Sequence, residues 1–278
     1  MNSDKAIDFR HQKLEKLKEY LKSFNSVAVA FSSGVDSTFL LKVAHEVLGN
    51  NVIAVTAKSA SFPNREKNEA DEFCKKEKIK QVFFDFKEMS VKGFCENPAN
   101  RCYLCKRELF RKIINIAEDE GIHIIAEGTN KDDEKDYRPG IKALEELNIK
   151  SPLRYAELNK EDIRILSKEM NLPTWKKPSL ACLATRFVYG EEITEEKLNM
   201  VDKAEQLLLD LGFSQIRCRI HGKMARIEIS PDEFDMILNT EVREKIYSEY
   251  KSYGFTYVTL DLKGYRTGSM NETLINKS

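Results

Sequence analysis

Short apolar runs alternate with stretches of helical periodicity in the first 170 residues. The runs are rich in β-branched and aromatic side chains and cover residues 27–31, 52–57, 81–86 and 122–127. Helical patterns cover residues 14–24, 39–48, 64–78, 104–120 and 161–170. Strands that alternate with helices predict an α/β fold with a doubly wound parallel sheet, which binds ligands at the carboxyl ends of its strands.

The pattern changes after residue 170. Two prolines in a polar run at 172–178 are typical of a connector. Thr194, followed by two glutamates, predicts a helix start, and strand patterns follow at 215–220, 225–230 and 256–262 around a helical pair at 231–252. We therefore expect a first domain at 1–176, a connector at 177–192 that holds Cys182, and a smaller α/β domain at 193–278 for substrate binding or oligomerisation.

A hydroxyl-rich turn around Gly34 separates the first apolar run from a helical stretch. Backbone N–H groups and the positive end of the helix dipole then converge on one spot, which favours an anion. The hydroxyl donors of this turn are Ser32, Ser33, Ser37 and Thr38. Asp36 does not suit a phosphate directly, so we expect it to hold Mg²⁺ or to order the loop.

This turn differs from the common nucleotide-binding loops. No lysine ends it, so G-x-x-x-x-G-K-[ST] is absent, and G-x-G-x-x-G is absent too. It resembles the SGGxDS signature of the PP-loop ATP pyrophosphatases, which cleave ATP between the α- and β-phosphates and adenylate a carbonyl or carboxylate oxygen. Ser33 stands where that signature has its first glycine, and a Cβ there disfavours positive φ.

Composition indicates a soluble globular protein. The 278 residues suffice for one large or two ordinary domains, with 41% hydrophobic and 32% charged residues. The formal net charge is zero, which gives no argument for nucleic acid or membrane partners. No apolar run approaches the roughly 18 residues that span a bilayer. Residues 1–5 lack the apolar core of a signal peptide, and with six cysteines we expect a reducing, cytoplasmic location.

Three cysteines are candidate metal ligands. Cys102 and Cys105 form a C-x-x-C motif, expected in the loop after the third strand, and Cys182 lies in the connector. Such a motif serves zinc, iron–sulfur clusters or thiol redox chemistry, and all three remain open. Three thiolates suit a [4Fe-4S] cluster with one iron left for a non-protein ligand. The other cysteines are Cys95, a weak fourth ligand, and Cys74 and Cys218, both expected to be structural.

Arg217 and Arg219 lie on the same side of a predicted strand. A hairpin turning near residues 222–223 would place Arg217 opposite Glu228 and Arg219 opposite Arg226. Like charges directly opposite are destabilising unless an anion lies between them. The arginines are therefore expected either on a solvated face with one Arg–Glu pair or in a phosphate or carboxylate site for a second substrate.

Several further segments match one family. They are residues 97–106, 127–133, 136–140, 151–153, 177–186, 189–190, 193–194 and 225–228. With the PP-loop they resemble the LarE family over residues 10 to 260. The resemblance implies an ATP-dependent sulfur transferase that converts carboxylates of pyridinium-3,5-biscarboxylic acid mononucleotide to thiocarboxylates, for the nickel-pincer cofactor of lactate racemase.

Members of the family supply sulfur by one of two mechanisms. In one, the cysteine matching Cys182 gives up its sulfur, and in the other a [4Fe-4S] cluster binds free sulfide. With Cys102, Cys105 and Cys182, this chain resembles members of the second kind. The resemblance also implies a small nucleotide substrate, sulfide and a homo-oligomer, often a hexamer. From the zero net charge and the lack of a long apolar run, we expect no membrane partner and disfavour nucleic acid. The resemblance places the arginine face, with Arg217, Arg219 and Glu228, near the substrate phosphate.

The expected reaction begins with ATP·Mg²⁺ on residues 32–38. A substrate carboxylate attacks the α-phosphorus, and sulfide then displaces AMP from the adenylate. Further expected nucleotide-site residues are Gly128, Asn130, Asp133, Lys106 and Arg186, with Arg101 as another nearby cation. Asp133 could equally belong to a solvated turn. Two alternatives stay open: a PP-loop tRNA thiolase, disfavoured because no basic or zinc-ribbon module is present, and a zinc-stabilised nucleotide-binding protein.

Overall fold

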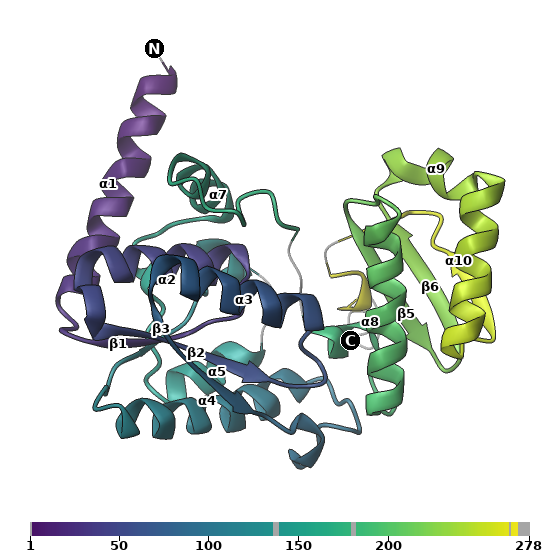
Figure 1. Ribbon diagram of the computed structural model, residues 1–278, viewed down its shortest axis with the longest axis horizontal. Helices are drawn as coiled ribbons and strands as arrows, with labels where there is room; N and C mark the ends of the chain where they lie inside the picture. Colours follow the sequence, from purple (N-terminus) through teal and green to yellow (C-terminus); the bar gives the residue numbers. More distant parts are fainter. Residues whose placement is uncertain (1, 136–138, 179–181, 267, 272–278) are drawn as a thin grey trace. The chain divides into compact units, whose positions relative to one another are not determined.

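A computed structural model describes residues 2–135, 139–178, 182–266 and 268–271 (Figure 1). Two stretches of the family-like motifs, residues 136–138 and 179–181, lie outside the described residues. The chain forms two compact units. The first comprises residues 1–59, 64–86 and 102–180, and the second comprises residues 60–63, 87–101 and 181–278.

A four-stranded sheet forms the centre of the first unit. Its strands are β1 (Val27–Ala30), β2 (Val52–Lys58), β3 (Lys80–Asp85) and β4 (Ile125–Ala126). They pair in the order β3-β2-β1-β4, and every pairing is parallel, which confirms the predicted α/β sheet. The chain places β2 and β3 on one side of β1 and β4 on the other. The carboxyl ends of β1 and β4 therefore flank the switch point at which such sheets bind ligands.

Helices cover both faces of this sheet (Figure 1). They are α1 (Asn2–Lys22), α2 (Val35–Leu48), α3 (Asn64–Glu77), α4 (Arg101–Asp119), α5 (Pro139–Glu146), α6 (Pro152–Tyr155) and α7 (Lys160–Glu169). Val27 and Val29 of β1 pack in a core with α1, α2 and α7, whereas Ala28 packs with α4 and α5. Burial on both faces explains why β1 is apolar throughout. No described helix is long and apolar enough to cross a membrane.

The second unit has its own three-stranded sheet. Strands β5 (Ile216–His221) and β6 (Met224–Ile229) are antiparallel, and β7 (Tyr257–Leu260) is parallel to β6. The helices are α8 (Glu195–Asp210), α9 (Phe234–Leu238) and α10 (Thr240–Tyr253). The Thr194 side chain accepts a hydrogen bond from Lys197 N, so the predicted cap of α8 is confirmed.

Two predicted boundaries were wrong. Helix α4 begins at Arg101 rather than at 104, because a turn closed by Arg101 N and Pro98 O, 2.9 Å apart, leads directly into the helix. The C-x-x-C motif thus stands on the first turns of a helix and not in a loop. The fourth strand is shorter than predicted, because Ile122 N bonds to Ala117 O and so belongs to the turn that closes α4.

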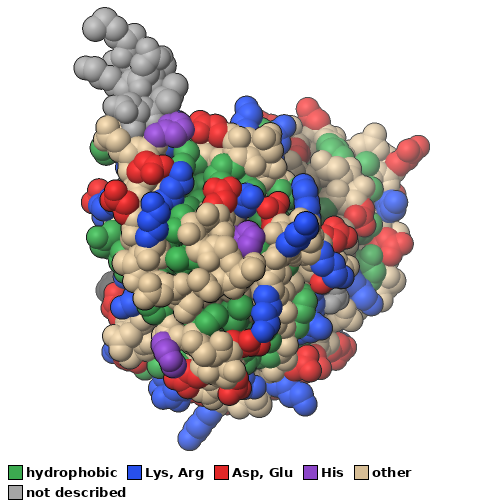
Figure 2. Space-filling view, turned by 60° about the vertical axis from the view of Figure 1, so that its left-hand side comes forward, with side chains coloured by type: hydrophobic (Ala, Val, Ile, Leu, Met, Phe, Trp, Pro, Cys, Tyr) green, Lys and Arg blue, Asp and Glu red, His purple; other side chains and the backbone are tan. Residues whose placement is uncertain are grey.

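Surface charge is mixed on the face drawn in Figure 2. Among its described residues, Lys and Arg side chains are interspersed with Asp and Glu. Charged side chains in the described part of the chain also pair at the surface, such as Lys42 with Glu46 and Glu77. A nucleic-acid site would gather basic side chains on one face, so this face does not support the tRNA alternative.

Candidate functional site

The loop between β1 and α2 takes an unusual backbone conformation at Ser33. Its φ is 49°, in the left-handed region that favours glycine. Ser33 is almost fully buried, and its Oγ donates to Glu66 O at 3.0 Å and to Glu66 Oε2 at 3.2 Å. These two hydrogen bonds offset the conformational energy that a positive φ costs a residue with a Cβ. Serine therefore adopts here the backbone geometry that the family signature supplies with glycine.

The hydroxyl groups of Ser32 and Ser37 form hydrogen bonds within the β1–α2 loop. Ser32 Oγ and Ser37 Oγ lie 3.2 Å apart, and Ser37 Oγ donates to Gly34 O at 3.3 Å. Gly34 is the extended residue ahead of α2, so the N–H groups of the first helical turn lie directly behind the loop. Thr38 Oγ1 is buried and has no hydrogen-bond partner within the described structure. The arrangement is that of an anion site.

The loops that follow β1 and β4 touch at Gly128. A Cβ on Gly128 would lie 3.0 Å from Ser37 N and 3.3 Å from Asp36 Cβ, so a side chain there would push the two loops apart. Asn130 is fully buried, and its Nδ2 donates to Asp36 Oδ1 at 3.2 Å. These contacts bring together Asp36, Gly128 and Asn130, three of the residues expected at the nucleotide site.

Asp133 holds the second loop in shape. It is buried, and its Oδ2 accepts a hydrogen bond from Asn130 N at 3.0 Å. Asn130 Oδ1 accepts from Asp132 N at 2.9 Å, and Asp132 Oδ2 accepts from Lys160 N at 2.9 Å. Asp133 is thus part of the structure that presents Asn130, not of a solvated turn.

Asp36 lies where a hard cation would be stabilised. Burial raises the pKa of Asp36; Lys160 opposes that effect, and Asp133 adds to it. An ionised carboxylate in such surroundings gains from a nearby positive charge. Carboxylate and phosphate oxygens are the ligands that Mg²⁺ prefers, so Asp36 suits that ion in chemistry and position.

Glu127 supports the same turn, although the sequence pattern did not indicate a function for it. Its carboxylate accepts hydrogen bonds from Thr129 N at 3.1 Å, Thr129 Oγ1 at 2.7 Å and Ser151 Oγ at 2.6 Å. It is 7% exposed. The only signal in the sequence is an acidic residue directly before Gly128, at the end of an apolar run.

Lys177 also received no role from the sequence. Arg164 of α7 donates to Trp175 O at 2.7 Å and to Lys177 O at 2.8 Å, which fixes the segment after α7. Lys177 Nζ lies 3.1 Å from Ser33 O and 3.1 Å from Glu66 Oε1. A lysine distant in sequence therefore contacts the β1–α2 loop.

Lys106 and the C-x-x-C motif lie at the start of α4. Cys102 and Cys105 are half-buried, are not in disulfides, and share one side of the helix at i, i+3 spacing. A Cβ on Gly140 would lie 2.7 Å from Lys106 Cδ and 3.5 Å from Cys102 O. Gly140 thus lets α5 approach Lys106 and the backbone of the motif.

The hairpin of the second unit has the predicted register. Arg217 pairs with Glu228, and Arg219 pairs with Arg226. The ion pairs do not follow this register. Glu228 is fully buried, and its Oε2 lies 3.0 Å from Arg219 Nη2 while its Oε1 lies 3.1 Å from Arg226 Nη2. The anion required between the two opposed arginines is therefore an internal carboxylate.

Arg186 anchors the segment that contains Cys182. It ends the short 3₁₀ helix η4 (Leu183–Arg186), is fully buried, and forms two 2.8 Å bonds to Glu205. Burial disfavours both charges, yet their attraction raises the pKa of Arg186 and lowers that of Glu205. Arg186 Nη1 also donates to Cys182 O at 3.1 Å.

Arg101 likewise contacts main chain in the second unit. It is buried, and its Nη1 donates to Ala184 O at 2.9 Å and to Asn97 Oδ1. These bonds hold η4 by its backbone. Arg101, which the sequence suggested as a cation near the nucleotide, therefore makes structural contacts.

Positive charge exceeds negative charge around Arg217. Burial and the neighbouring Arg186 lower the pKa of Arg217 to about 10. Its guanidinium lies 5.1 Å from the centre of the Tyr265 ring. Among the described residues of this cluster, five guanidinium groups accompany three carboxylates: Arg186, Arg217, Arg219, Arg226 and Arg266, with Glu205, Glu228 and Asp261. Such an excess favours a bound anion.

The remaining cysteines differ in their surroundings. Burial raises the pKa of Cys74 to about 12 and also raises that of Cys218, so both are inert thiols as expected. Cys182 is exposed and belongs to the second unit, whereas Cys102 and Cys105 belong to the first. Within the described residues, no group of three or more His, Cys, Asp or Glu side chains could hold a metal ion.

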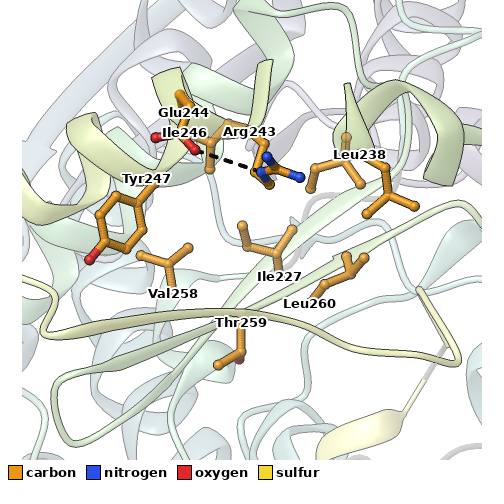
Figure 3. Close-up of a pocket in the computed structure, with 10 residues that line it drawn as sticks. Ile227, Leu238, Arg243, Glu244, Ile246, Tyr247, Val258, Thr259 and Leu260 are labelled. Atoms are coloured by element: carbon orange, nitrogen blue, oxygen red, sulfur yellow. Dashed lines mark ion pairs between the residues drawn. The ribbon is translucent and has the colours of Figure 1, made fainter. Parts of the chain in front are cut away.

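A separate hollow lies in the second unit (Figure 3). It has a volume of about 340 Å³ and is lined mainly by apolar side chains, including Ile227 and Leu260, with an ion pair of 3.8 Å between Arg243 and Glu244. None of the residues predicted to act in the reaction lines it. Its apolar lining offers little to a phosphate.

Known proteins resemble this chain over nearly its whole length, although no protein-family model matches it. A Synechocystis sp. protein described as uncharacterized is 39% identical over 262 residues, 94% of this chain and 98% of that protein. The pyridinium-3,5-bisthiocarboxylic acid mononucleotide synthase of Lactiplantibacillus plantarum is 36% identical over 257 residues, 91% of this chain and 92% of that enzyme.

A more distant similarity agrees with the fold. One polypeptide of the glutamine-hydrolyzing GMP synthase of Methanocaldococcus jannaschii is 28% identical over 217 residues, 72% of this chain and 68% of that polypeptide. Its match supports the superfamily indicated by the β1–α2 loop and the parallel sheet. The chain belongs to the LarE family of sulfurtransferases, within the PP-loop ATP pyrophosphatase superfamily.

Proposed function

We propose that this enzyme uses ATP to adenylate a carboxylate of pyridinium-3,5-biscarboxylic acid mononucleotide and then exchanges the activated oxygen for sulfur. The observation that supports it best is the junction of Asp36 and Ser37 with Gly128 and Asn130, at the switch point of a parallel sheet. The name of the L. plantarum synthase, which gives pyridinium-3,5-bisthiocarboxylic acid mononucleotide as its product, supports this choice of substrate. The backbone N–H groups of residues 32–38 would bind the phosphates of ATP.

Asp36 would hold Mg²⁺ together with phosphate oxygens. When bound, the ion neutralises charge on the phosphates. The substrate carboxylate oxygen forms a bond to the α-phosphorus, the bond from that phosphorus to the bridging oxygen breaks, and pyrophosphate leaves with the electron pair. The contribution of the chain is to place the reactants and to offset their charge.

The arginine cluster of the second unit is the proposed site for the phosphate of the mononucleotide. Its excess positive charge supports this role. Burial and the neighbouring Arg186 lower the pKa of Arg217, and a bound anion would offset both effects. Arg219 and Glu228 bond to each other in the buried layer. We therefore infer that Arg217 contacts the phosphate and that Arg219 and Glu228 position it.

For sulfur delivery we propose that Cys102, Cys105 and Cys182 ligate a [4Fe-4S] cluster. Thiolates are the usual ligands of such clusters, and the i, i+3 spacing of Cys102 and Cys105 on α4 suits two ligands to one group. When bound, the cluster supplies an iron that is open to a non-protein sulfide. The exposure of Cys182 supports its role as a third ligand.

The test is anaerobic purification followed by iron and labile-sulfide counting and a multiple-turnover assay with ATP, sulfide and the mononucleotide. We expect a brown protein with about four irons per chain and broad absorption near about 400 nm. Cys102→Ala should lose both colour and turnover, whereas Cys95→Ala should keep both. A colourless zinc protein, or continued cycling by Cys102→Ala, would refute the cluster; salt-sensitive tRNA binding would favour the thiolase alternative.

A further inference from the structure

The β1–α2 loop has no lysine of its own, yet an ammonium group rests on it. Lys177 Nζ donates to Ser33 O at 3.1 Å and lies 3.4 Å from Ser33 Oγ. The Lys177 side chain is only 12% exposed. The two bonds from Arg164 to the carbonyls of residues 175 and 177 keep the backbone of this segment in place.

Two carboxylates share this ammonium, and they differ in burial. Glu66 Oε1 lies 3.1 Å from Lys177 Nζ, its side chain is 4% exposed, and its other oxygen accepts from Ser33 Oγ. Glu69 also pairs with Lys177, but its side chain is 46% exposed. An exposed ion pair contributes little. Glu66 thus keeps the ammonium beside Ser33, while the contact with Glu69 can be exchanged at low cost.

We propose that Lys177 is a phosphate-binding cation of the nucleotide site, and that ATP replaces Glu69 as its partner through a β- or γ-phosphate oxygen. The proposal rests on the proposed use of ATP. In other nucleotide-binding loops, a lysine at the end of the loop reaches these phosphates. Here the cation comes from the segment after α7, and its flexible stem permits a short movement from carboxylate to phosphate.

Local charge supports the exchange. Asp36, Glu66 and Glu69 surround the loop with carboxylates, which disfavour a polyphosphate unless a cation offsets them. Lys177 is a cation in direct contact with the loop backbone. A doubly charged terminal phosphate attracts the ammonium more strongly than a solvated carboxylate does.

The first test measures binding by calorimetry with Mg²⁺ present. Lys177→Met should weaken binding of ATP and of pyrophosphate about 10- to 100-fold, the usual worth of a charge-assisted hydrogen bond. AMP, which lacks the β- and γ-phosphates, should bind within about twofold of wild type. Lys177→Arg keeps the charge and should recover most of the affinity.

The second test separates ligand binding from a structural role. Glu69→Gln removes the competing carboxylate and should tighten ATP binding about two- to fivefold. If Lys177 only fastens its segment to the loop, the same change weakens ATP binding or leaves it unaltered. Glu72→Gln is the matched control, because Glu72 is exposed on the same helix and the change in charge is equal.

The outcomes distinguish this inference from the proposed function. Wild-type protein that does not bind ATP overturns both. Wild-type protein that binds ATP, with Lys177→Met binding it equally well or Glu69→Gln not binding it more tightly than Glu72→Gln, overturns the role of Lys177 alone. Should Lys177→Met fail to fold, Glu69→Gln still decides, because its side chain is half in solvent.

Discussion

Replacing Gly128 with alanine tests whether the two loops at the switch point form one structure. The added Cβ would lie 3.0 Å from Ser37 N and 3.3 Å from the Cβ of Asp36, closer than nine in ten real Cβ contacts. Its neighbours include backbone, which cannot rotate away. The β1–α2 loop must therefore shift by a few tenths of an ångström.

The expected cost follows from that shift. Overpacking of this kind destabilises by about 1–3 kcal/mol, which lowers Tm by roughly 2–10 °C for a protein of this size. Displacement of the N–H groups around Ser37 should weaken ATP binding about 10- to 100-fold, because one or two charge-assisted bonds are lost. Thermal unfolding and calorimetric titration with ATP·Mg²⁺ measure the two effects separately.

Gly121→Ala is the matched control. Gly121 has a φ of 73° and nothing within 4 Å of its Cβ position, so alanine there strains the backbone without touching the site. It should lower Tm and leave ATP affinity unchanged. Wild-type affinity in Gly128→Ala would refute the reasoning, and equal losses in both variants would mean that binding merely follows stability.

Two further substitutions should change the stability of the protein in opposite directions. Arg186→Met leaves Glu205 buried without its guanidinium and should cost about 3–5 kcal/mol in chemical denaturation; a loss below about 1 kcal/mol would contradict the role of that pair. Burial raises the pKa of Asp36 in the folded protein. The free energy of unfolding is therefore lower at a pH above this pKa, where the buried carboxyl is ionised, than at a pH at which it is protonated. Asp36→Asn should therefore raise Tm at pH 7 while abolishing turnover, with the gain in Tm vanishing as pH falls through the pKa; a gain that persists in acid would contradict this cause.

Local signals predicted the fold well. The apolar run before Gly34, the hydroxyl-rich turn and the helix after it depend on neighbouring residues, and so does the alternation of strands and helices. Parallel topology then brings the ends of β1 and β4 together without further information. The contact of Gly128 with the Asp36–Ser37 backbone follows from that rule.

Non-local contacts could not be predicted. The conformation of Ser33 depends on Glu66 and on Lys177, which is 144 residues distant. The start of α4 at Arg101 depends on a turn that Arg101 N and Pro98 O close. In the hairpin, cross-strand position gave the right register but not the bonding, because arginine side chains are long enough to reach the diagonal Glu228.

The bond from Arg186 to Cys182 reaches the carbonyl oxygen and does not involve sulfur. This bond therefore holds the residue in the second unit through its main chain, which alkylation or oxidation of the side chain leaves unchanged. Either reaction at the sulfur atom would keep this hydrogen bond. Protein carrying a carboxymethyl group at Cys182 should thus unfold at the same temperature as the untreated protein, so that any loss of turnover reports on chemistry alone.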